Sequence, residues 1–154
     1  MLLDLSAQMP ERLAALDALV ESSHELLQAA TDKARAMLAT GEEFGWDFVS
    51  LQPLPDGIAS AGLFVLPAGS SPTPHRHPNS IQHMRRISGK ASVAITLGDQ
   101  TLERSVTAED PWVVIEADAR HRIDVGPEEF VVISFHTASQ EELLEVTETG
   151  ERHY

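Results

Sequence analysis

Apolar residues near the start of the chain recur at three- and four-residue spacing, which is the pattern of an amphipathic helix. The first stripe contains Leu13, Leu16 and Val20, and the second contains Leu26, Leu27, Ala30, Ala34 and Met37. The sequence Ser22-Ser23-His24-Glu25 matches a capping box, in which a serine and a glutamate satisfy the first backbone N–H groups of a helix. The pattern predicts a helical arm over residues 10–40, broken in two near Ser22 and ended by Gly41.

After Gly41 the chain changes to short apolar runs separated by Gly, Pro, Asp and Ser, which is typical of an all-β domain. Gly98 and Asp99 stand between two of these runs and predict a tight hairpin turn. Eight short strands favour a small barrel or jelly roll, with the helical arm packed against an outer face. The expected strands are 47–51, 58–66, 81–88, 91–97, 101–106, 112–116, 121–125 and 130–136.

The end of the chain is more polar. Ser139-Gln140-Glu141-Glu142 is a second capping-box pattern and predicts the start of a short helix, whereas residues 147–154 are expected to be loose. The chain then divides into an arm (1–42), a barrel (43–138) and a tail (139–154). All three belong to one expected domain, because 154 residues is the size of a single domain with its own core.

Composition excludes several kinds of chemistry. The chain has no cysteine, which rules out disulfides, thiolate metal ligands and a cysteine nucleophile. Its start lacks a basic region, and no apolar run approaches the length of a membrane span, so we expect a cytoplasmic protein. A formal net charge of −13 argues against nucleic acid or an anionic membrane as a partner, because both bind basic surfaces.

The charge is unevenly distributed along the sequence. No acidic residue occurs between Asp56 and Asp99, a stretch that contains Arg76, Arg85, Arg86, Lys90 and three histidines. One interpretation is that this basic centre binds a small anionic molecule. The other is that the arginines pair with acidic loops elsewhere in the chain.

Three of the seven histidines lie within nine residues, at His75, His77 and His83. If the backbone is extended, the side chains of His75 and His77 point to the same face, because strand side chains alternate with period two. Neutral imidazole is the commonest protein ligand for transition metals. Composition alone predicts about 0.3 such His-x-His pairs, so further ligands are needed to support a metal site.

The spacing of Gly69, His75, His77, Gln82 and Gly89 resembles the first motif of the cupin superfamily. In that motif a glycine, five residues, His-x-His, three or four residues, a glutamate, six residues and a glycine follow in order. Gln82 stands where the motif has glutamate.

The second cupin motif contains Pro-x-Gly-x-x-His, and His121 takes the place of its histidine. Glu116 and Asp118 replace the proline and the glycine. The resemblance covers residues 62–136, about half of the chain. It implies a small β-barrel that holds a metal at its open end, which agrees with the strand count.

The resemblance also implies a ligand set. In cupins the two histidines and the glutamate of the first motif bind the metal together with the histidine of the second, which correspond here to His75, His77, Gln82 and His121. Because a neutral glutamine is a poor ligand, we expect three histidines with open positions for substrate and O₂. One divalent transition metal is expected, with Fe(II) favoured over Ni, Zn, Mn or Cu, although loss of the metal is the competing interpretation.

The three-histidine pattern is similar to that of thiol dioxygenases, which carry Ser-x-His-x-Tyr on a late strand as a hydrogen-bonded relay. Ser134 and His136 keep the first two members, and Ala138 replaces the tyrosine. Strand alternation places Ser134 and His136 on one face, which could be the barrel interior. The alternative for His136 is a hydrogen-bonded histidine of the core.

By the same alternation Gln82, Met84 and Arg86 share a face, while His83 points away. An unpaired arginine is costly inside a barrel, so Arg86 is a candidate to bind a substrate carboxylate. A bulge in the strand would exchange Arg86 for Arg85, and a structural salt bridge is an equal alternative.

These observations predict a metal-binding cupin that acts as an Fe(II)-dependent dioxygenase on O₂ and a small anionic substrate such as a thiol acid. A metal-dependent lyase or isomerase is the alternative among enzymes. A non-catalytic barrel that binds a small ligand is the alternative from another class. The sequence leaves the oligomeric state open, with a homodimer as one option.

Overall fold

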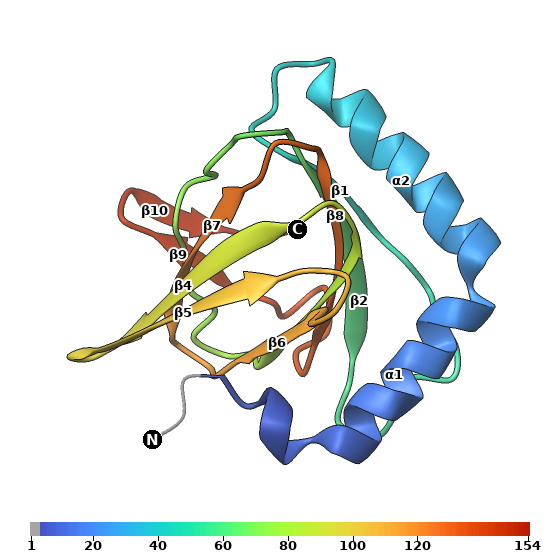
Figure 1. The fold of residues 1–154 in the computed structure, drawn as a ribbon, viewed down its shortest axis with the longest axis horizontal. Coiled ribbons are helices and arrows are strands. Elements are labelled where there is room, and N and C mark those ends of the chain that lie inside the picture. The colour runs from blue at the N-terminus through green and yellow to red at the C-terminus, as the bar shows by residue number, and fades with distance from the viewer. Residues whose placement is uncertain (1–3) are drawn as a thin grey trace.

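The structure, a computed structural model, describes residues 4–154 and places two helices against a set of antiparallel strands (Figure 1). A short 3₁₀ helix (Ser6–Gln8) precedes α1 (Pro10–Ser22) and α2 (His24–Leu38). The strands are β1 (Gly45–Phe48), β2 (Ser60–Leu66), β3 (Gln82–Ser88), β4 (Ala91–Leu97), β5 (Gln100–Val106), β6 (Trp112–Ile115), β7 (Arg120–Val125), β8 (Phe130–His136), β9 (Glu145–Thr147) and β10 (Gly150–Arg152).

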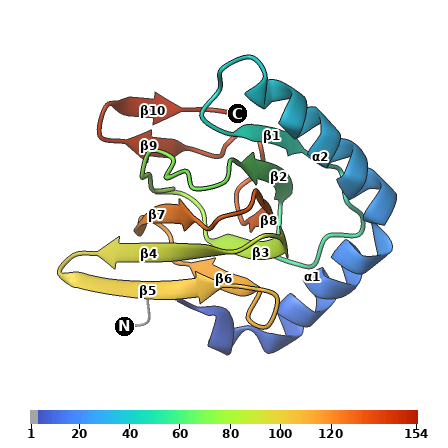
Figure 2. The same cartoon turned by 45° about the horizontal axis from the view of Figure 1, so that its top comes forward.

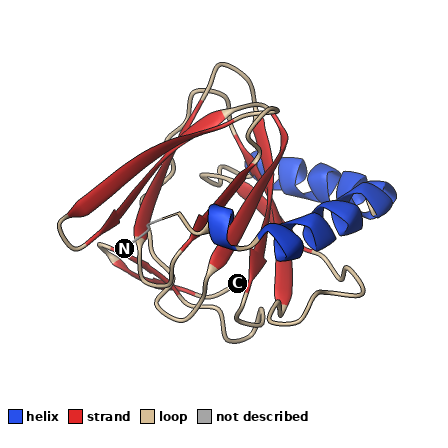
Figure 3. Cartoon of the chain, turned by 60° about the horizontal axis from the view of Figure 1, so that its bottom comes forward, coloured by secondary structure: helices blue, strands red, loops and turns tan. Residues whose placement is uncertain are grey.

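The strands form two main sheets, with the orders β1-β2-β8-β3-β6 and β5-β4-β7, and β9 and β10 make a separate hairpin. The helices lie along one side of the five-stranded sheet, and the β4–β5 hairpin projects on the other side of the molecule (Figures 2 and 3). This arrangement confirms the predicted all-β jelly roll with an N-terminal helical arm. Within the described residues, neither helix is long and apolar enough to cross a membrane.

All eight expected strands are present, each with ends within three residues of the prediction. The turn at Gly98 and Asp99 joins β4 to β5, whose first pair is Leu97 with Gln100. Gly98 has φ +59°, a conformation that glycine adopts without strain.

The helical arm buries the outer face of the five-stranded sheet. On β8, Val131, Ile133 and Phe135 pack into a core shared with the helices, whereas Phe130 and Val132 pack between the two sheets. A strand buried on both faces has a continuous apolar run in its sequence. This explains why residues 130–133 are all apolar and why Ser134 is the first polar residue of β8. All seven residues of β8 are buried, including the polar ones.

The predicted capping box at Ser22 is wrong. The hydroxyl of Ser22 donates to the carbonyl of Leu19 at 3.1 Å, at the C-terminal end of α1. Ser23 is the residue between the two helices, and its side chain makes no capping hydrogen bond. The break between the helices was predicted, but the serine closes the first helix instead of opening the second.

The predicted helix after Ser139 is also wrong, and the tail is not loose. Residues 139–143 form one turn, in which the N–H groups of Glu142 and Leu143 both donate to the carbonyl of Ser139. The chain then enters the β9–β10 hairpin. Val146 exchanges two backbone hydrogen bonds with Arg76, at 2.9 and 3.0 Å, and this pairing holds the tail in an extended conformation.

The shared core yields a stability prediction. Leu16 of α1 is fully buried between the arm and the sheet, so Leu16→Ala should lower the free energy of unfolding by about 2–5 kcal/mol. Leu26→Ala is the matched control, because Leu26 is 56% exposed, and its effect should stay within about 0.5 kcal/mol. Urea unfolding monitored by tryptophan fluorescence measures both. Equal effects of the two variants would mean that the arm does not pack on the barrel as described.

Candidate metal centre

A pair of backbone hydrogen bonds between His75 and His121 brings two distant segments together. The N–H of His75 donates to the carbonyl of His121 at 3.2 Å, and the N–H of His121 donates to the carbonyl of His75 at 2.8 Å. The next residue, Arg76, pairs in the same way with Val146 of β9. The segment that carries the His-x-His pair is thus fixed between β7 and the C-terminal hairpin.

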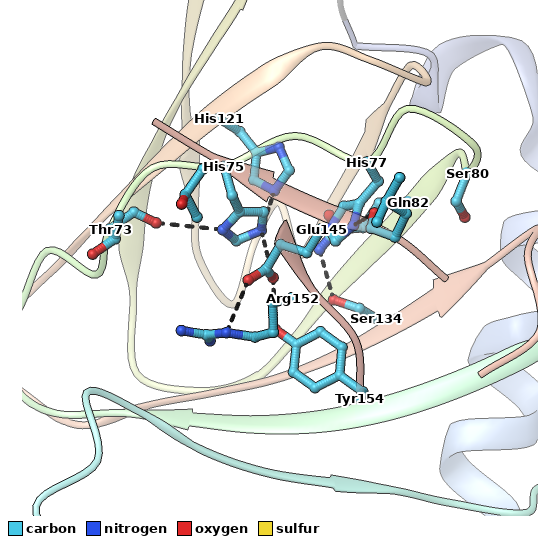
Figure 4. Close-up of polar contacts among 12 residues, drawn as sticks. Thr73, His75, His77, Ser80, Gln82, His121, Ser134, Glu145, Arg152 and Tyr154 are labelled. Atoms are coloured by element: carbon cyan, nitrogen blue, oxygen red, sulfur yellow. Dashed lines mark hydrogen bonds and ion pairs between the residues drawn. The ribbon is translucent and has the colours of Figure 1, made fainter. Parts of the chain in front are cut away.

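The imidazoles of His75, His77 and His121 converge on one point (Figure 4). One ring nitrogen from each lies within 4.8 Å of the other two, and the Nε2 atoms of His75 and His121 are 2.9 Å apart. His77 and His121 are buried, and His75 is nearly so. The structure therefore brings together the three histidines that the sequence singled out as ligands.

The other ring nitrogen of each histidine faces a backbone carbonyl. The Nδ1 atoms of His75, His77 and His121 lie 3.4, 3.0 and 3.2 Å from the carbonyl oxygens of Thr73, Leu144 and Ala119 respectively. A carbonyl oxygen only accepts, so each Nδ1 carries the proton and each Nε2 keeps its lone pair for the centre. This is the arrangement by which metal-binding histidines are usually oriented.

The protein environment keeps these rings uncharged. Burial lowers the pKa of His75 to about 3, and the neighbouring His77 contributes to the shift. Burial is also the main cause that lowers the pKa of His77 and holds the pKa of His121 well below its ordinary value. Two Nε2 lone pairs 2.9 Å apart repel unless a cation lies between them. The donor set therefore fits a divalent metal ion.

Gln82, Ser134 and His136 lie beside the histidines in the barrel interior. The amide nitrogen of Gln82 is 3.0 Å from the hydroxyl of Ser134, while its Oε1 is buried and has no hydrogen-bond partner among the described residues. The Nδ1 of His136 is 3.0 Å from the hydroxyl of Ser80, and its ring centre is 4.9 Å from that of His77. Burial holds the pKa of His136 well below its ordinary value.

These side chains line a cavity of about 40 Å³, which accommodates only a small molecule, since one water needs at least about 10–15 Å³. More than half of the lining is apolar. The lining residues are Phe44, Phe64, Leu66, Pro72, His75, His77, Gln82, Met84, Ile123, Val132, Ser134, His136, Leu143, Glu145 and Tyr154.

Two of these lining residues, Glu145 and Tyr154, were not predicted. Glu145 is buried, and its Oε1 lies 3.5 Å from the Nε2 of His75. The hydroxyl of Tyr154 donates to the same oxygen at 2.6 Å, and burial raises the pKa of Tyr154. The alternation of Leu144-Glu145-Val146-Thr147 is typical of a strand, but it predicts Glu145 on the polar side, so the sequence carried no signal for the burial of Glu145.

The structure does not bring Arg86 to this cavity. Its guanidinium donates to the carbonyls of Gly89 and Ile87, at 2.7 and 3.3 Å, where β3 ends. Arg85 donates to Asp17 of α1 at 2.7 Å. A bulge is present between Arg86 and Ser88, but neither arginine faces the histidines.

Two arginines of the acid-free stretch between Asp56 and Asp99 pair with acidic residues elsewhere in the chain, which was the second interpretation of that stretch. Arg76 forms an ion pair with Asp118, and Arg85 forms one with Asp17, so both are paired with acids from other segments. His83 lies on the opposite face of β3 from Gln82, as predicted, with its Nε2 3.3 Å from Arg12 of α1. Asp118 occupies the glycine position of the second motif and has φ +69°, the left-handed conformation that a glycine would favour.

No protein-family model and no curated protein matches the chain. Among solved structures, the Lactobacillus farciminis oxalate decarboxylase formate complex matches 70% of this chain and 32% of its own length, with a TM-score of 0.58 and 18% identity. Oxalate decarboxylase from Bacillus subtilis at pH 4.6 matches 58% of this chain and 23% of its own length, with a TM-score of 0.53 and 20% identity. The coconut allergen cocosin matches 57% of this chain and 23% of its own length, with a TM-score of 0.52 and 20% identity.

These three proteins have the cupin fold, so the jelly roll described above is of the cupin type. The chain spans about a quarter to a third of the length of each of them. Their likeness therefore establishes the architecture of the barrel alone.

The convergence of the Nε2 atoms predicts a metal-to-protein ratio close to one. His77→Ala should lose the ion, because removal of one of three strong ligands leaves no adequate site. His24→Ala is the matched control, since His24 is exposed at the start of α2. Elemental analysis after dialysis measures the ratio, and full retention of metal by His77→Ala would mean that the ligands are misassigned.

Gln82 yields a second prediction for this site. Because its amide nitrogen is held by Ser134, Gln82→Ala should keep the metal affinity within about tenfold of the wild type while it changes the cavity. Titration of the metal-free protein measures the dissociation constant. A loss of affinity as large as that of His77→Ala would identify Gln82 as a ligand.

Proposed function

We propose that this protein is an Fe(II)-dependent dioxygenase that acts on a small anionic substrate, with a thiol acid as the leading candidate. The observation that carries the proposal is the convergence of three Nε2 lone pairs, from His75, His77 and His121, at the edge of a small buried cavity. Bound there, Fe(II) supplies open coordination positions at which a substrate and O₂ can meet.

The three histidines are neutral ligands, so they leave the charge of a divalent ion uncompensated. A net positive centre inside an otherwise acidic protein attracts an anion. The apolar part of the lining, which includes Phe64, Met84 and Val132, excludes water and strengthens this attraction.

Gln82, Ser134 and His136 are the polar residues proposed to contact the substrate. Ser134 holds the amide of Gln82, so the unpartnered Oε1 is available to accept a hydrogen bond from a substrate N–H, O–H or S–H group. Ser80 fixes the ring of His136 through Nδ1. His136 is the proposed proton acceptor, because its ring lies beside His77 at the cavity, with Ser134 as its companion on β8.

The guanidinium that the structure connects to the site is that of Arg152. Its Nε lies 3.4 Å from Oε2 of Glu145, and its side chain is 42% exposed, so it stands at the entrance. We propose Arg152 as the group that guides a substrate carboxylate. Arg86 remains the candidate from the sequence, although its guanidinium is bonded to carbonyls of its own strand end.

A metal-dependent lyase is the second candidate. The buried carboxylate of Glu145 beside His75 favours it, because such a group can accept or supply a proton in a reaction that needs no O₂. The similar folds include oxalate decarboxylases, and a small carboxylic acid would fit the cavity size.

Oxygen uptake by the iron-loaded protein tests the proposal. A panel of thiol acids, diketones and hydroxylated aromatic acids should contain a substrate that raises uptake above a control with free iron. Carbon dioxide release from small carboxylic acids without oxygen uptake would favour the lyase. Binding of panel members at the metal without either reaction would leave a non-catalytic barrel.

The two arginines are compared once a substrate is found. Arg152→Ala should raise KM about tenfold or more because it removes the guiding charge at the entrance, whereas Arg86→Ala should leave KM close to that of the wild type. Steady-state kinetics at constant metal loading measures both. A larger rise in KM for Arg86→Ala than for Arg152→Ala would identify Arg86 as the residue that binds the substrate carboxylate.

A further inference from the structure

We infer that Glu145 of the C-terminal hairpin is a fourth protein ligand of the metal, in addition to His75, His77 and His121. The inference rests on the proposed metal site and extends it. It assigns a carboxylate to a centre whose first-motif position is occupied by the neutral Gln82.

The distance between the two candidate ligand atoms fits this role. Oε1 of Glu145 lies 3.5 Å from Nε2 of His75. Two ligand atoms bound to one ion at about 2.0–2.2 Å are separated by about 2.8–3.6 Å when they are neighbours in an octahedral or tetrahedral shell. The same holds for the 2.9 Å between the Nε2 atoms of His75 and His121. One ion can therefore contact Nε2 of His75 together with either of the other two atoms, and the inference requires Glu145 to move toward the three-histidine cluster, whose ligand atoms lie within 4.8 Å of one another.

The hydrogen-bonding capacity of His75 and Glu145 also indicates a cation between them. Nδ1 of His75 faces the carbonyl of Thr73, so the lone pair of Nε2 is directed toward the centre. A carboxylate oxygen is also an acceptor. Two acceptors that face each other at 3.5 Å in a buried site are stabilised by a positive ion between them.

The surroundings of Glu145 hold its carboxylate in place. Tyr154 donates to Oε1 at 2.6 Å, and Nε of Arg152 lies 3.4 Å from Oε2. The ring of Tyr154 packs against Trp46, with ring centres 5.0 Å apart. Hydrogen bonds of this kind orient the ligating carboxylates of metal sites, and they leave lone pairs of the carboxylate free for the ion.

The backbone provides a second reason. Val146 pairs with Arg76, which stands between the two histidines of the His-x-His pair. The carbonyl of Leu144 accepts from Nδ1 of His77. Glu145 thus lies between two residues that are themselves bonded to the ligand segment, and its buried carboxylate lies beside His75 (Figure 4).

A carboxylate ligand changes the properties of the centre. It lowers the net charge at the ion by one and favours harder ions such as Mn(II) and Fe(II). It also connects the ion to the β9–β10 hairpin, because Val146 and Arg152 of the hairpin, together with Tyr154 just after it, bond to Glu145 or to the histidine segment. Metal binding should therefore order the hairpin as well as the histidines.

The test compares metal affinities in metal-free protein to which Mn(II) is added. Glu145→Gln keeps the shape of the side chain but removes its charge, and it should weaken Mn(II) binding by about 100-fold or more. Glu148→Gln is the matched control, because it makes the same change at a carboxylate of the same hairpin that is 80% exposed and pairs with Arg120. It should keep the affinity within about tenfold. Titration calorimetry measures the dissociation constants.

Hydrogen exchange supplies a readout independent of affinity. Addition of Mn(II) should slow the exchange of the amides of residues 145–152 in the wild type but not in Glu145→Gln at a concentration that saturates both. Thermal unfolding of the metal-free variants verifies that each is folded. A third variant, Glu145→Ala, should behave as Glu145→Gln does.

The possible failures are distinguishable. Equal weakening by Glu145→Gln and Glu148→Gln would show that the loss of one negative charge, and not the loss of a ligand, lowers the affinity, which overturns the inference. Wild-type affinity in Glu145→Gln, with no binding by His77→Ala, would also overturn it while the three-histidine centre stands. Metal binding by His77→Ala equal to that of the wild type, or no binding by the wild type, would overturn the proposed site itself.

Discussion

The site depends on the reciprocal backbone hydrogen bonds between His75 and His121. These residues are far apart in the sequence, and each carries an imidazole whose position follows from the backbone that bears it. The bridge places the two Nε2 atoms 2.9 Å apart, and the carbonyls of Thr73 and Ala119 then fix both tautomers. The resulting convergence of lone pairs is unfavourable without a cation. The backbone pairing of His75 with His121 therefore favours a metal ion at this point.

The strands and the three-histidine cluster could be predicted because the signals are local. Apolar runs separated by turn residues define β2 to β8, and the turn at Gly98 needs only its own residues. The spacing between Gly69 and Gly89 indicated a metal-binding loop although Gln82 replaces a ligand. Asp118 replaces the glycine of the second motif, yet its backbone keeps the left-handed conformation that a glycine would adopt there.

The features that were missed depend on contacts between distant segments. Ser139-Gln140-Glu141-Glu142 has the composition of a helix start, but the pairing of Val146 with Arg76 draws the chain into a hairpin. Glu145 and Tyr154 reach the site only through that pairing. Arg86 was expected in the cavity on the assumption of a regular strand, whereas β3 is bulged and ends there, so its guanidinium turns to nearby carbonyls. None of these outcomes follows from the periodicity of one segment.

Anomalous X-ray diffraction from crystals grown with Mn(II) tests the central claim most directly, because it locates the ion without reference to activity. We expect a single strong peak about 2.0–2.3 Å from Nε2 of His75, His77 and His121 and from one oxygen of Glu145. A peak bound through the Nδ1 atoms, a peak elsewhere on the molecule, or the absence of any peak at saturating Mn(II) would contradict it.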